Sequence, residues 1–375
     1  MKKIHITLVG GQPAPIYNAI ASINPDKVIY ICSNSENSIK VLKSLKQEIN
    51  IESQTINLDT TSPIKIEKCA QTLAQTYKDD EVTINISSGL KSWAYWFSVV
   101  FHPYTNASVV YIDQNNLLWN YRTMQSSNDL NFDMHILFRL YGNSIENNYV
   151  PFDHYTPEDF LAIKKIEEMR RFNFQVFNKL TTLLSKEQSH QINNNKVGEF
   201  TLDKSSVSWD KTTSTIKISL WKHDRNERCS ITSPHATQLL FNTNWFEIKV
   251  AQILSQWDKA KEICVNCKFP FNKNLDKNEV DIIVNTGTKL LFVECKTQIA
   301  STTDIDKFRS VIKNYGGMGS KGLFITDAPM KDMAKAKCDE HNIISLSLKD
   351  DHSLLGANKA LYLLLNNEID NLNTK

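Results

Sequence analysis

The sequence predicts an α/β protein with two sheet-containing domains. Two observations lead to this class. Within the first 113 residues, five apolar runs rich in Ile and Val alternate with amphipathic stretches of helical length. After about residue 240 the order changes to three consecutive strands before a helical crossover. A chain of 375 residues is also long for a single domain, so we expect two packed units.

The five N-terminal strands are predicted from continuous apolar runs, which favour a parallel sheet covered on both faces. Because a helical segment follows each of the first four, we expect a doubly wound, Rossmann-like domain. The expected strands are IHITLV (4–9), KVIYIC (27–32), IESQTIN (51–57), VTINI (82–86) and ASVVYID (107–113), with helices from about 14, over 36–48, over about 64–77 and from 89. LLWNYR (117–122) and MHILFRLYG (134–142) have no helical segment between them and predict a hairpin-like extension.

The middle of the chain is expected to connect the two units. Its composition turns polar over about 125–160, which indicates loops and a domain boundary. One long helix is expected over about 157–186, with Thr156 as its cap, Pro157 at its first position and Glu158 and Asp159 in its first turn. SSVSWD (205–210) and TIKISLW (215–221) are expected to be short strands of a connecting subdomain. The expected domains are therefore 1–145, a connector over 146–238, and 239–375.

The C-terminal region does not follow a simple βα repeat. Its predicted elements are a helix over about 244–257, strands over 261–269, 279–285 and 289–297, a helix over 303–315, a strand over 321–326, a helix over 329–341 and a strand over 343–348. Neither a fixed-period repeat nor a low-complexity tract is found.

Composition limits the classes of partner and compartment. With 43 Lys and Arg against 41 Asp and Glu, the formal charge is +2, so any site for a polyanion must be local. Seven widely scattered cysteines are typical of a reducing compartment, and we expect a cytoplasmic protein. The N-terminal apolar run is too short for an export signal. The most apolar later stretch, WAYWFSVVF (93–101), is also too short to span a membrane.

The segment NEVDIIVNTGTKLLFVECKT predicts an antiparallel hairpin that turns at 285–288. With the turn centred on Thr286 and Gly287, Ile282 is expected opposite Leu291, and Val280 opposite Val293. One apolar face would then carry Val280, Ile282, Val284, Leu291, Val293 and Cys295. The other face would carry Asp281, Glu294 and Lys296, with Asp281 opposite Phe292 and Glu294 its diagonal neighbour at roughly 7 Å.

Two carboxylates and an ammonium in one place suit metal-assisted hydrolysis of a phosphodiester. Asp281 and Glu294 offer the hard oxygen ligands that Mg²⁺ or Mn²⁺ prefers, and the backbone carbonyl of Cys295 is a further candidate ligand. Lys296 can orient the water or stabilise developing negative charge. The alternative is a solvated Glu–Lys pair at a strand end. Glu279 is a competing carboxylate, for which we favour the role of a solvated strand-end charge.

The spacing D-x12-E-x-K on consecutive strands resembles the PD-(D/E)xK motif of restriction-endonuclease-like nucleases, over about 240–350. The proline of that motif is absent, because Val280 precedes Asp281. Many members also use a glutamate on the preceding helix, and NWFEIKVAQIL places Glu247 in that role. The resemblance implies that Glu247, Asp281, Glu294 and Lys296 serve a divalent-metal-dependent endonuclease.

A second candidate site lies where the strand VTINI runs into NISSGLKSW. Ser87, Ser88 and Gly89 form the turn, and Lys91 follows in the first turn of a helix, so free backbone N–H groups, the helix dipole and an ammonium favour an anion. We expect the loop after the first strand, Gly10, Gly11 and Gln12, to lie beside it. The alternative is that Ser88 caps the helix and that Lys91 is incidental.

The pattern N-x-S-S-G-x-K resembles the ligand turn of CARF domains, over about 1–145, although Leu90 replaces a small residue common there. That family implies a homodimer that binds a cyclic oligoadenylate through Gly10, Gly11, Gln12, Ser87, Ser88, Gly89 and Lys91. A CARF-like domain followed by a PD-(D/E)xK-like domain resembles the ancillary nucleases of type III CRISPR defence that cyclic tetra-adenylate activates. The resemblance implies cleavage of DNA, RNA or both. The alternatives are a ligand-responsive regulatory protein that binds nucleic acid without cutting it, and a sensor domain that also cleaves its own ligand.

Several other signals are not assigned a function. Cys264 and Cys267 form a CxxC without a second pair, so we expect packing rather than zinc binding. The aromatic run at 93–101 is expected to be core. The histidines at 102, 154, 190 and 235 share no spacing, and none is predicted to be catalytic.

Overall fold

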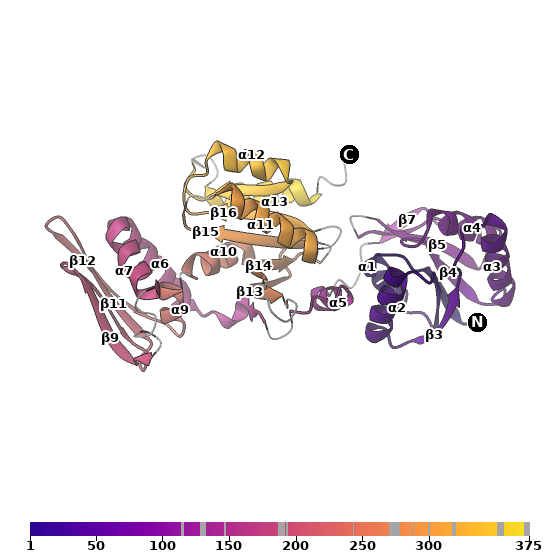
Figure 1. Ribbon diagram of the computed structural model, residues 1–375, viewed down its shortest axis with the longest axis horizontal. Helices are drawn as coiled ribbons and strands as arrows, with labels where there is room; N and C mark the ends of the chain where they lie inside the picture. Colours follow the sequence, from indigo (N-terminus) through magenta and orange to yellow (C-terminus); the bar gives the residue numbers. More distant parts are fainter. Residues whose placement is uncertain are drawn as a thin grey trace.

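The computed structural model describes residues 1–113, 116–127, 133–145, 148–186, 192, 194–242, 244–269, 278–287, 289–298, 301–316, 320–350 and 356–370. The strands of these residues form three sheets that follow one another along the long axis of the molecule (Figure 1). The N-terminal sheet lies at one end, the C-terminal sheet in the middle and the sheet of residues 197–232 at the other end. None of the described helices combines the length and the apolar character needed to cross a bilayer.

The N-terminal sheet is the parallel, doubly wound sheet that the βα repetition predicts. Its strand order is β3-β2-β1-β4-β5-β6-β7, so the winding reverses between β1 and β4, which pair in parallel. One face is covered by α1 and α2, the other by α3 and α4, each with its own apolar core. The elements are β1 (Lys3–Leu8), α1 (Ala14–Ile23), β2 (Lys27–Cys32), α2 (Glu36–Glu48), β3 (Glu52–Asn57), α3 (Pro63–Thr76), β4 (Glu81–Asn85), α4 (Lys91–Phe101) and β5 (Ala107–Ile112).

The predicted hairpin-like extension is only half right. β6 (Leu118–Asn120) and β7 (Gln125–Ser127) extend the sheet antiparallel to β5, but MHILFRLYG forms a helix, α5 (Met134–Leu140), instead of a strand. The reason is local. The side chain of Asp133 accepts hydrogen bonds from the N–H groups of His135 and Ile136 and so caps a helix.

Helix α5 belongs to two cores at once. Leu137 and Leu140 pack into the core that α1 and α2 share with the N-terminal sheet. Met134 and Phe138 pack into a core of the C-terminal sheet, where the Phe138 ring lies 5.1 Å from that of Phe269. Residues inside the expected range 1–145 therefore contribute to the packing of the C-terminal sheet.

The expected single helix over 157–186 is two helices, α6 (Pro157–Phe172) and α7 (Phe174–Lys186). Asn173 interrupts them, because its side chain accepts a hydrogen bond from the N–H of Val176 and donates one to the carbonyl of Trp221. At the start of α6, Thr156 and Asp159 form the capping box that its sequence allows.

The two strands predicted in the connector are confirmed and belong to a four-stranded antiparallel sheet of order β12-β11-β10-β9. One face of this sheet packs against α6, α7 and the short helix α9, which contribute to the same apolar core. The elements are β9 (Val197–Leu202), β10 (Ser205–Asp210), β11 (Thr215–Lys222), β12 (Arg225–Thr232) and α9 (Ala236–Phe241).

The C-terminal sheet has the predicted element order and the strand order β17-β16-β15-β14-β13-β8. β15, β16 and β17 run parallel, whereas β14 is antiparallel to both β13 and β15. A final helix, α13, was not predicted. The elements are β8 (Val150–Pro151), α10 (Trp245–Ser255), β13 (Glu262–Phe269), β14 (Asn278–Asn285), β15 (Leu290–Lys296), α11 (Thr302–Val311), β16 (Lys321–Thr326), α12 (Asp332–Glu340), β17 (Ile343–Ser347) and α13 (Ala357–Asp370).

The register predicted for the β14–β15 hairpin is wrong by two positions. Ile282 pairs with Val293, not with Leu291, and the ladder runs on to Asn285 and Leu290. The turn is therefore centred after Gly287, which takes a left-handed backbone conformation (φ +84°). Phe292 pairs with Ile283, so it does not lie opposite Asp281 as predicted. Asp281 and Glu294 are the residues next to the last pair of the ladder, Ile282 and Val293, so the two carboxylates lie at the same end of the hairpin.

One residue also lies on a different face from the one predicted. Five of the six expected apolar residues share a core, namely Ile282, Val284, Leu291, Val293 and Cys295. Val280 packs on the opposite side. The pairing of β13 with β14 breaks between Val265–Ile282 and Cys267–Val280, where Asn266 has a φ of +53°. At this irregularity, next to Asp281, the side chains at the start of β14 change from one face of the sheet to the other.

Candidate functional site

The carboxylates predicted to act together converge at one edge of the C-terminal sheet. Asp281 lies near the start of β14, Glu294 near the end of the antiparallel strand β15, and Glu247 in the first turn of α10. The main-chain N–H of Cys295 donates a hydrogen bond of 2.7 Å to Oδ2 of Asp281. Nζ of Lys296 lies 2.5 Å from Oε1 of Glu294. Three elements thus bring three acids and one ammonium together.

The surroundings of these acids raise their pKa values and so disfavour their charged forms. Burial raises the pKa of Asp281 to about 7, and the charge of Glu294 adds to that effect. Burial, followed by the charge of Asp281, raises the pKa of Glu247 well above its usual range. Burial also raises the pKa of Glu294, although Lys296 opposes it. A group of partly buried carboxyls with raised pKa values is typical of a functional site.

The donor set suits a hard divalent cation. Oε2 of Glu247 is buried without a hydrogen-bond partner, so one carboxylate oxygen is left to be satisfied by something else. Carboxylate oxygens are the ligands that Mg²⁺ and Mn²⁺ prefer. The Cys295 thiol packs in the apolar core on the other side of the strand, so only its backbone carbonyl can contribute.

Glu279 behaves as the solvated strand-end charge that the sequence predicts. Its side chain is about half exposed (48%) and lies 3.9 Å from Nζ of Lys268. It still raises the pKa values of Asp281 and Glu247 through its charge, although it contributes less than burial does.

Sequence reasoning missed a polar chain of side chains beside this site. Nε2 of His154 lies 2.9 Å from Nε2 of His235, whose Nδ1 lies 2.9 Å from Oδ2 of the buried Asp159. His154 lines a polar cavity of about 660 Å³ together with Asn266 and Glu279. His154 and His235 are 81 residues apart, so no spacing could have paired them. His190 lies outside the described residues.

Among the described residues, the trio whose ligand atoms lie close enough together to share one metal ion is a different one, because Glu247, Asp281 and Glu294 do not all lie within that distance of one another. Ligand atoms of His135, Glu262 and Cys264 all lie within 4.8 Å of one another. Nε2 of His135 is 3.2 Å from Oε1 of Glu262, so the two already satisfy each other as an ion pair. Cys264 and Cys267 are buried in β13, which agrees with the packing role that we expected for the CxxC.

At the other candidate site, the loops after β1 and β4 lie side by side, as predicted. Their strands are neighbours at the point where the winding reverses, which is the usual ligand crevice of such a sheet. The N–H of Gly10 donates to Oγ of Ser88 at 3.1 Å. A Cβ on Gly10 would lie 2.5 Å from the nitrogen of Gly89, so this approach requires glycine.

A family comparison matches this part of the chain. Residues 4–140 fit the model described as the Card1 CARF domain. Residues 4–140 are a CARF domain.

Within the CARF domain, the predicted ligand residues divide into two groups. Ser87 is used internally: its hydroxyl donates to Oδ1 of Asn85 and accepts from the N–H of Ile112. Gln12 accepts a hydrogen bond of 2.8 Å from the hydroxyl of Tyr141. Gly11 and the side chain of Lys91, by contrast, are exposed to solvent.

The first turn of α4 is not capped by Ser88, so that part of the alternative is wrong, whereas the role of Lys91 stays a prediction. The helix begins at Lys91 rather than at Gly89, and its cap residue, Leu90, makes no side-chain capping bond. Gly89 instead adopts a φ of +84° in the turn between β4, which ends at Asn85, and α4. Of the aromatic run in α4, Trp93, Phe97 and Phe101 are core as predicted, whereas Tyr95 is 62% exposed.

Some solved structures share the fold of almost the whole chain, including the part outside the CARF domain. Can2 from Sulfobacillus thermosulfidooxidans, solved with cyclic tetra-adenylate, matches at a TM-score of 0.67 and 14% identity, covering 98% of this chain and 99% of that one. Protein VC1899 from Vibrio cholerae matches at 0.70 and 14%, covering 98% and 97%. A type III CRISPR defence DNA nuclease activated by cyclic oligoadenylate matches at 0.58 and 14%, covering 94% of this chain and 49% of that one. A comparison with curated protein sequences gives no match.

Proposed function

We propose that this chain is a nuclease of type III CRISPR defence that depends on a divalent metal and is activated by a cyclic oligoadenylate. The observation that carries the catalytic half is the grouping of the half-buried Glu247, Asp281 and Glu294 beside Lys296, with one buried Glu247 oxygen left without a partner. Such an arrangement costs stability unless a cation joins it, which is why we assign it to function.

In the proposed mechanism, Asp281 and Glu294 hold Mg²⁺ or Mn²⁺, with Glu247 and the carbonyl of Cys295 as further ligands or supports. The bound metal supplies Lewis acidity toward the phosphate and lowers the pKa of a water. Burial lowers the pKa of Lys296, but the charge and hydrogen bond of Glu294 outweigh it and raise that pKa above its ordinary value. Lys296 therefore stays protonated and stabilises the negative charge that develops on the phosphate.

For the sensor half, we propose that the CARF domain binds cyclic tetra-adenylate between the Gly10–Gln12 loop and the turn at 87–89. The exposed Lys91 and the uncapped N-terminus of α4 supply the positive field that phosphates need. The choice of a four-membered ring rests on the fold shared with Can2, which was solved with that ligand.

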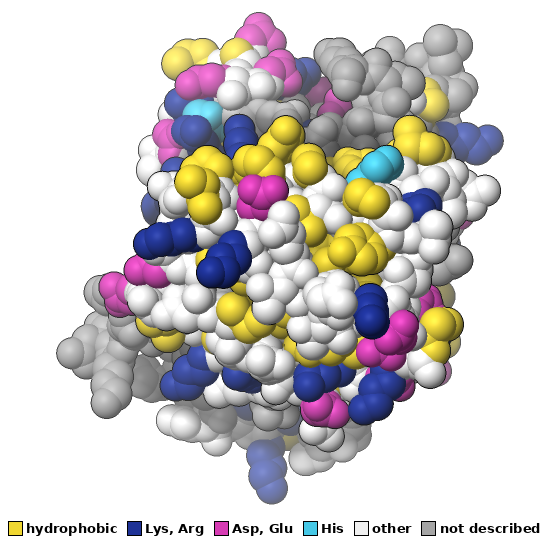
Figure 2. Space-filling view, turned by 90° about the vertical axis from the view of Figure 1, so that its right-hand side faces the viewer, with side chains coloured by type: hydrophobic (Ala, Val, Ile, Leu, Met, Phe, Trp, Pro, Cys, Tyr) yellow, Lys and Arg dark blue, Asp and Glu magenta, His cyan; other side chains and the backbone are white. Residues whose placement is uncertain are grey.

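We also propose a homodimer formed through the α4 side of the CARF domain. Figure 2 views the molecule from the α3–α4 end and shows apolar side chains among basic ones on this face. The exposed large apolar side chains of α3, α4 and its cap residue are Ile64, Leu90, Tyr95 and Val99. A two-fold axis beside Lys91 would present two equivalent phosphate-binding turns to one ring.

The proposed setting is the cytoplasm, where the seven free cysteines would remain reduced. The proposed substrate is DNA, RNA or both.

One assay tests the function directly: single- and double-stranded DNA and RNA are incubated with the full chain, Mn²⁺ and cyclic tetra-adenylate. Parallel reactions contain chelator or lack the activator. Cleavage that requires both additions supports the proposal. Activator-dependent binding without cleavage would instead favour the regulatory alternative.

A further inference from the structure

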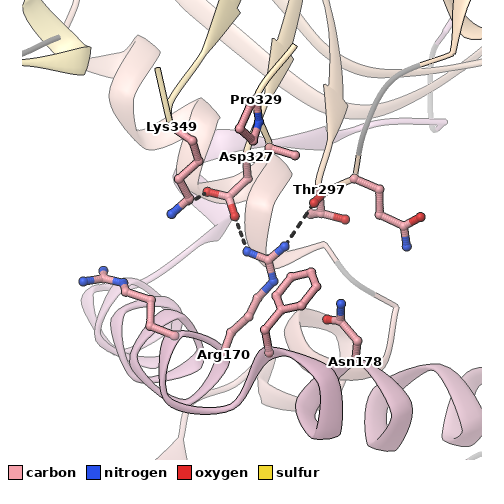
Figure 3. A pocket seen from close by; sticks show the side chains of 10 residues that line it. Arg170, Asn178, Thr297, Asp327, Pro329 and Lys349 are labelled. Atoms are coloured by element: carbon pink, nitrogen blue, oxygen red, sulfur yellow. Dashed lines mark hydrogen bonds and ion pairs between the residues drawn. The ribbon is translucent and has the colours of Figure 1, made fainter. Parts of the chain in front are cut away.

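A second cavity, of about 670 Å³, is lined by residues that follow strands of the C-terminal sheet (Figure 3). Thr297 directly follows β15, Asp327 directly follows β16, and Lys349 comes two residues after β17. The other wall is formed by Arg170 of α6 and by Phe174 and Asn178 of α7. The cavity therefore lies at the carboxyl ends of three parallel strands.

The cavity is a neighbour of the candidate active site along this edge. β15 lies between β14, which carries Asp281, and β16, which Asp327 directly follows. Nη2 of Arg170 donates a hydrogen bond of 3.0 Å to the carbonyl of Thr297, the residue after Lys296. A nucleic-acid strand bound at the carboxylates and extending toward β17 would therefore pass over this cavity.

The charges around the cavity favour an anion. Three cations, Arg170, Arg171 and Lys349, line it together with a single acid, Asp327. Asp327 is only 1% exposed and is paired with both Arg170 and Lys349, the latter at 3.5 Å. Its charge is thus compensated inside the wall, and the exposed Arg171 adds further positive charge at the rim.

The cavity also offers a surface on which an aromatic base can stack. The side chain of Phe174 is 49% exposed. The guanidinium carbon of Arg170 lies 4.7 Å from the centroid of the Phe174 ring and 5.3 Å from that of Trp245. Arg170 is itself fixed by Asp327 and Thr297, so it holds the ring from one side and leaves the exposed part for a ligand.

We propose that this cavity binds one unpaired nucleotide of the substrate strand, with its base against Phe174 and its phosphates toward Arg171 and Lys349. The inference rests on the proposed nuclease function and adds a substrate-binding subsite to it. Base, aromatic ring and cation are the combination by which proteins hold single-stranded nucleic acid. A base within a duplex is stacked on both faces and paired with its partner, so its ring cannot lie against Phe174.

The test measures binding rather than cleavage. The full-length Glu294→Gln variant, with cyclic tetra-adenylate and chelator present, is titrated into fluorescent 12-mers of thymidine and into abasic 12-mers with the same phosphates. The thymidine strand should bind more tightly, on the order of 5- to 150-fold for one stacked base. This comparison uses no substitution in the cavity, so misfolding of a cavity variant does not affect it.

Cavity variants in the same background assign the effect to Phe174. Phe174→Ala should remove the preference for thymidine, and Phe174→Tyr should keep it. Leu161→Ala, which truncates another exposed apolar side chain on α6 (60% exposed), should change nothing. Arg171→Ala should weaken both strands alike and reduce their salt dependence.

The proposal is overturned if the two 12-mers bind equally, if neither binds, or if the thymidine preference survives in Phe174→Ala. The outcome is separable from the nuclease function. Cleavage by the wild-type chain without any base preference would leave the nuclease proposal standing and remove the subsite. A base preference that depends on Phe174, in a chain that cleaves no nucleic acid, would support the nucleotide-binding subsite and contradict the nuclease proposal.

Discussion

The main-chain N–H of Cys295 donates a 2.7 Å hydrogen bond to Oδ2 of Asp281. This bond links the start of β14 to the end of β15, just beyond the last pair of their ladder, Ile282 and Val293. It stabilises the charged form of Asp281, but burial and the charge of Glu294 outweigh it, so the pKa still rises to about 7. The position of Asp281 is therefore fixed by a hydrogen bond, and a bound cation would stabilise its charged form. Both properties can be tested.

Asp281→Asn should abolish cleavage without unfolding the protein. The amide oxygen can still accept the hydrogen bond from Cys295, but the anionic metal ligand is lost, so we expect activity to fall roughly 100-fold or more. Activator-dependent cleavage and the melting temperature are measured together. Glu279→Gln is the matched control, since it removes a nearby but solvated carboxylate; equal losses in the two variants would contradict the assignment.

The stability of the metal-free protein should fall as the pH rises toward and through 7. Asp281 has a pKa of about 7 when folded, raised from its ordinary value of 3.8, so the folded state binds its proton more tightly than the unfolded state does. The resulting stabilisation is complete below about pH 4 and is lost as the pH rises through 7. Melting curves in chelator from pH 5 to 8 should therefore decline more steeply for the wild type than for Asp281→Asn. Parallel curves would argue against a buried, protonated Asp281.

Lys91→Glu should uncouple the sensor from the nuclease. Reversing the charge beside the α4 N-terminus should weaken the binding of cyclic tetra-adenylate on the order of 10- to 100-fold, because charge-assisted phosphate contacts are lost. Divalent-metal binding at the nuclease site should be unchanged, as isothermal titration can show. Lys78→Glu changes an equally exposed lysine just before β4, at the opposite edge of the sheet, and should leave ligand affinity intact.

Gly89→Ala should damage the CARF domain more than Gly142→Ala does. Both glycines have positive φ values, +84° and +76°, so each substitution carries backbone strain on the order of 1–2 kcal/mol. Only at Gly89 would the new Cβ also lie 2.7 Å from Cβ of Leu8, whereas nothing lies within 4 Å at Gly142. Denaturant unfolding and ligand titration of the two variants measure the difference. Similar losses would mean that the turn tolerates a side chain.

The N-terminal fold and the C-terminal element order could be predicted because their signals are local. Apolar runs such as KVIYIC, separated by helical segments, predict strands of a covered parallel sheet, and the structure contains all five strands. β3 differs in burial, because it lies at the edge of the sheet and most of its residues are exposed. The carboxylates of the candidate site could also be singled out, since Asp281 and Glu294 lie on the two strands of one hairpin.

The errors arose where a single side chain decided between two structures. The apolar run MHILFRLYG is compatible with a helix or a strand, and the cap by Asp133 favours the helix. Asn173 divides the predicted long helix into α6 and α7. Gly287 moved the turn and with it the whole register of β14. The pairing of His154 with His235 depends on how distant segments fold together, so the sequence carries no pattern for it.

Helix α5 has one more consequence. Its side chains are divided between two cores, with Leu137 and Leu140 in one and Met134 and Phe138 in the other. The Phe138 ring lies 6.4 Å from that of Phe292, which is two residues before Glu294. If ligand binding moves the N-terminal sheet, α5 must either move with it or lose its packing against one of the two cores. In both cases the packing around β15, the strand that carries Glu294, changes.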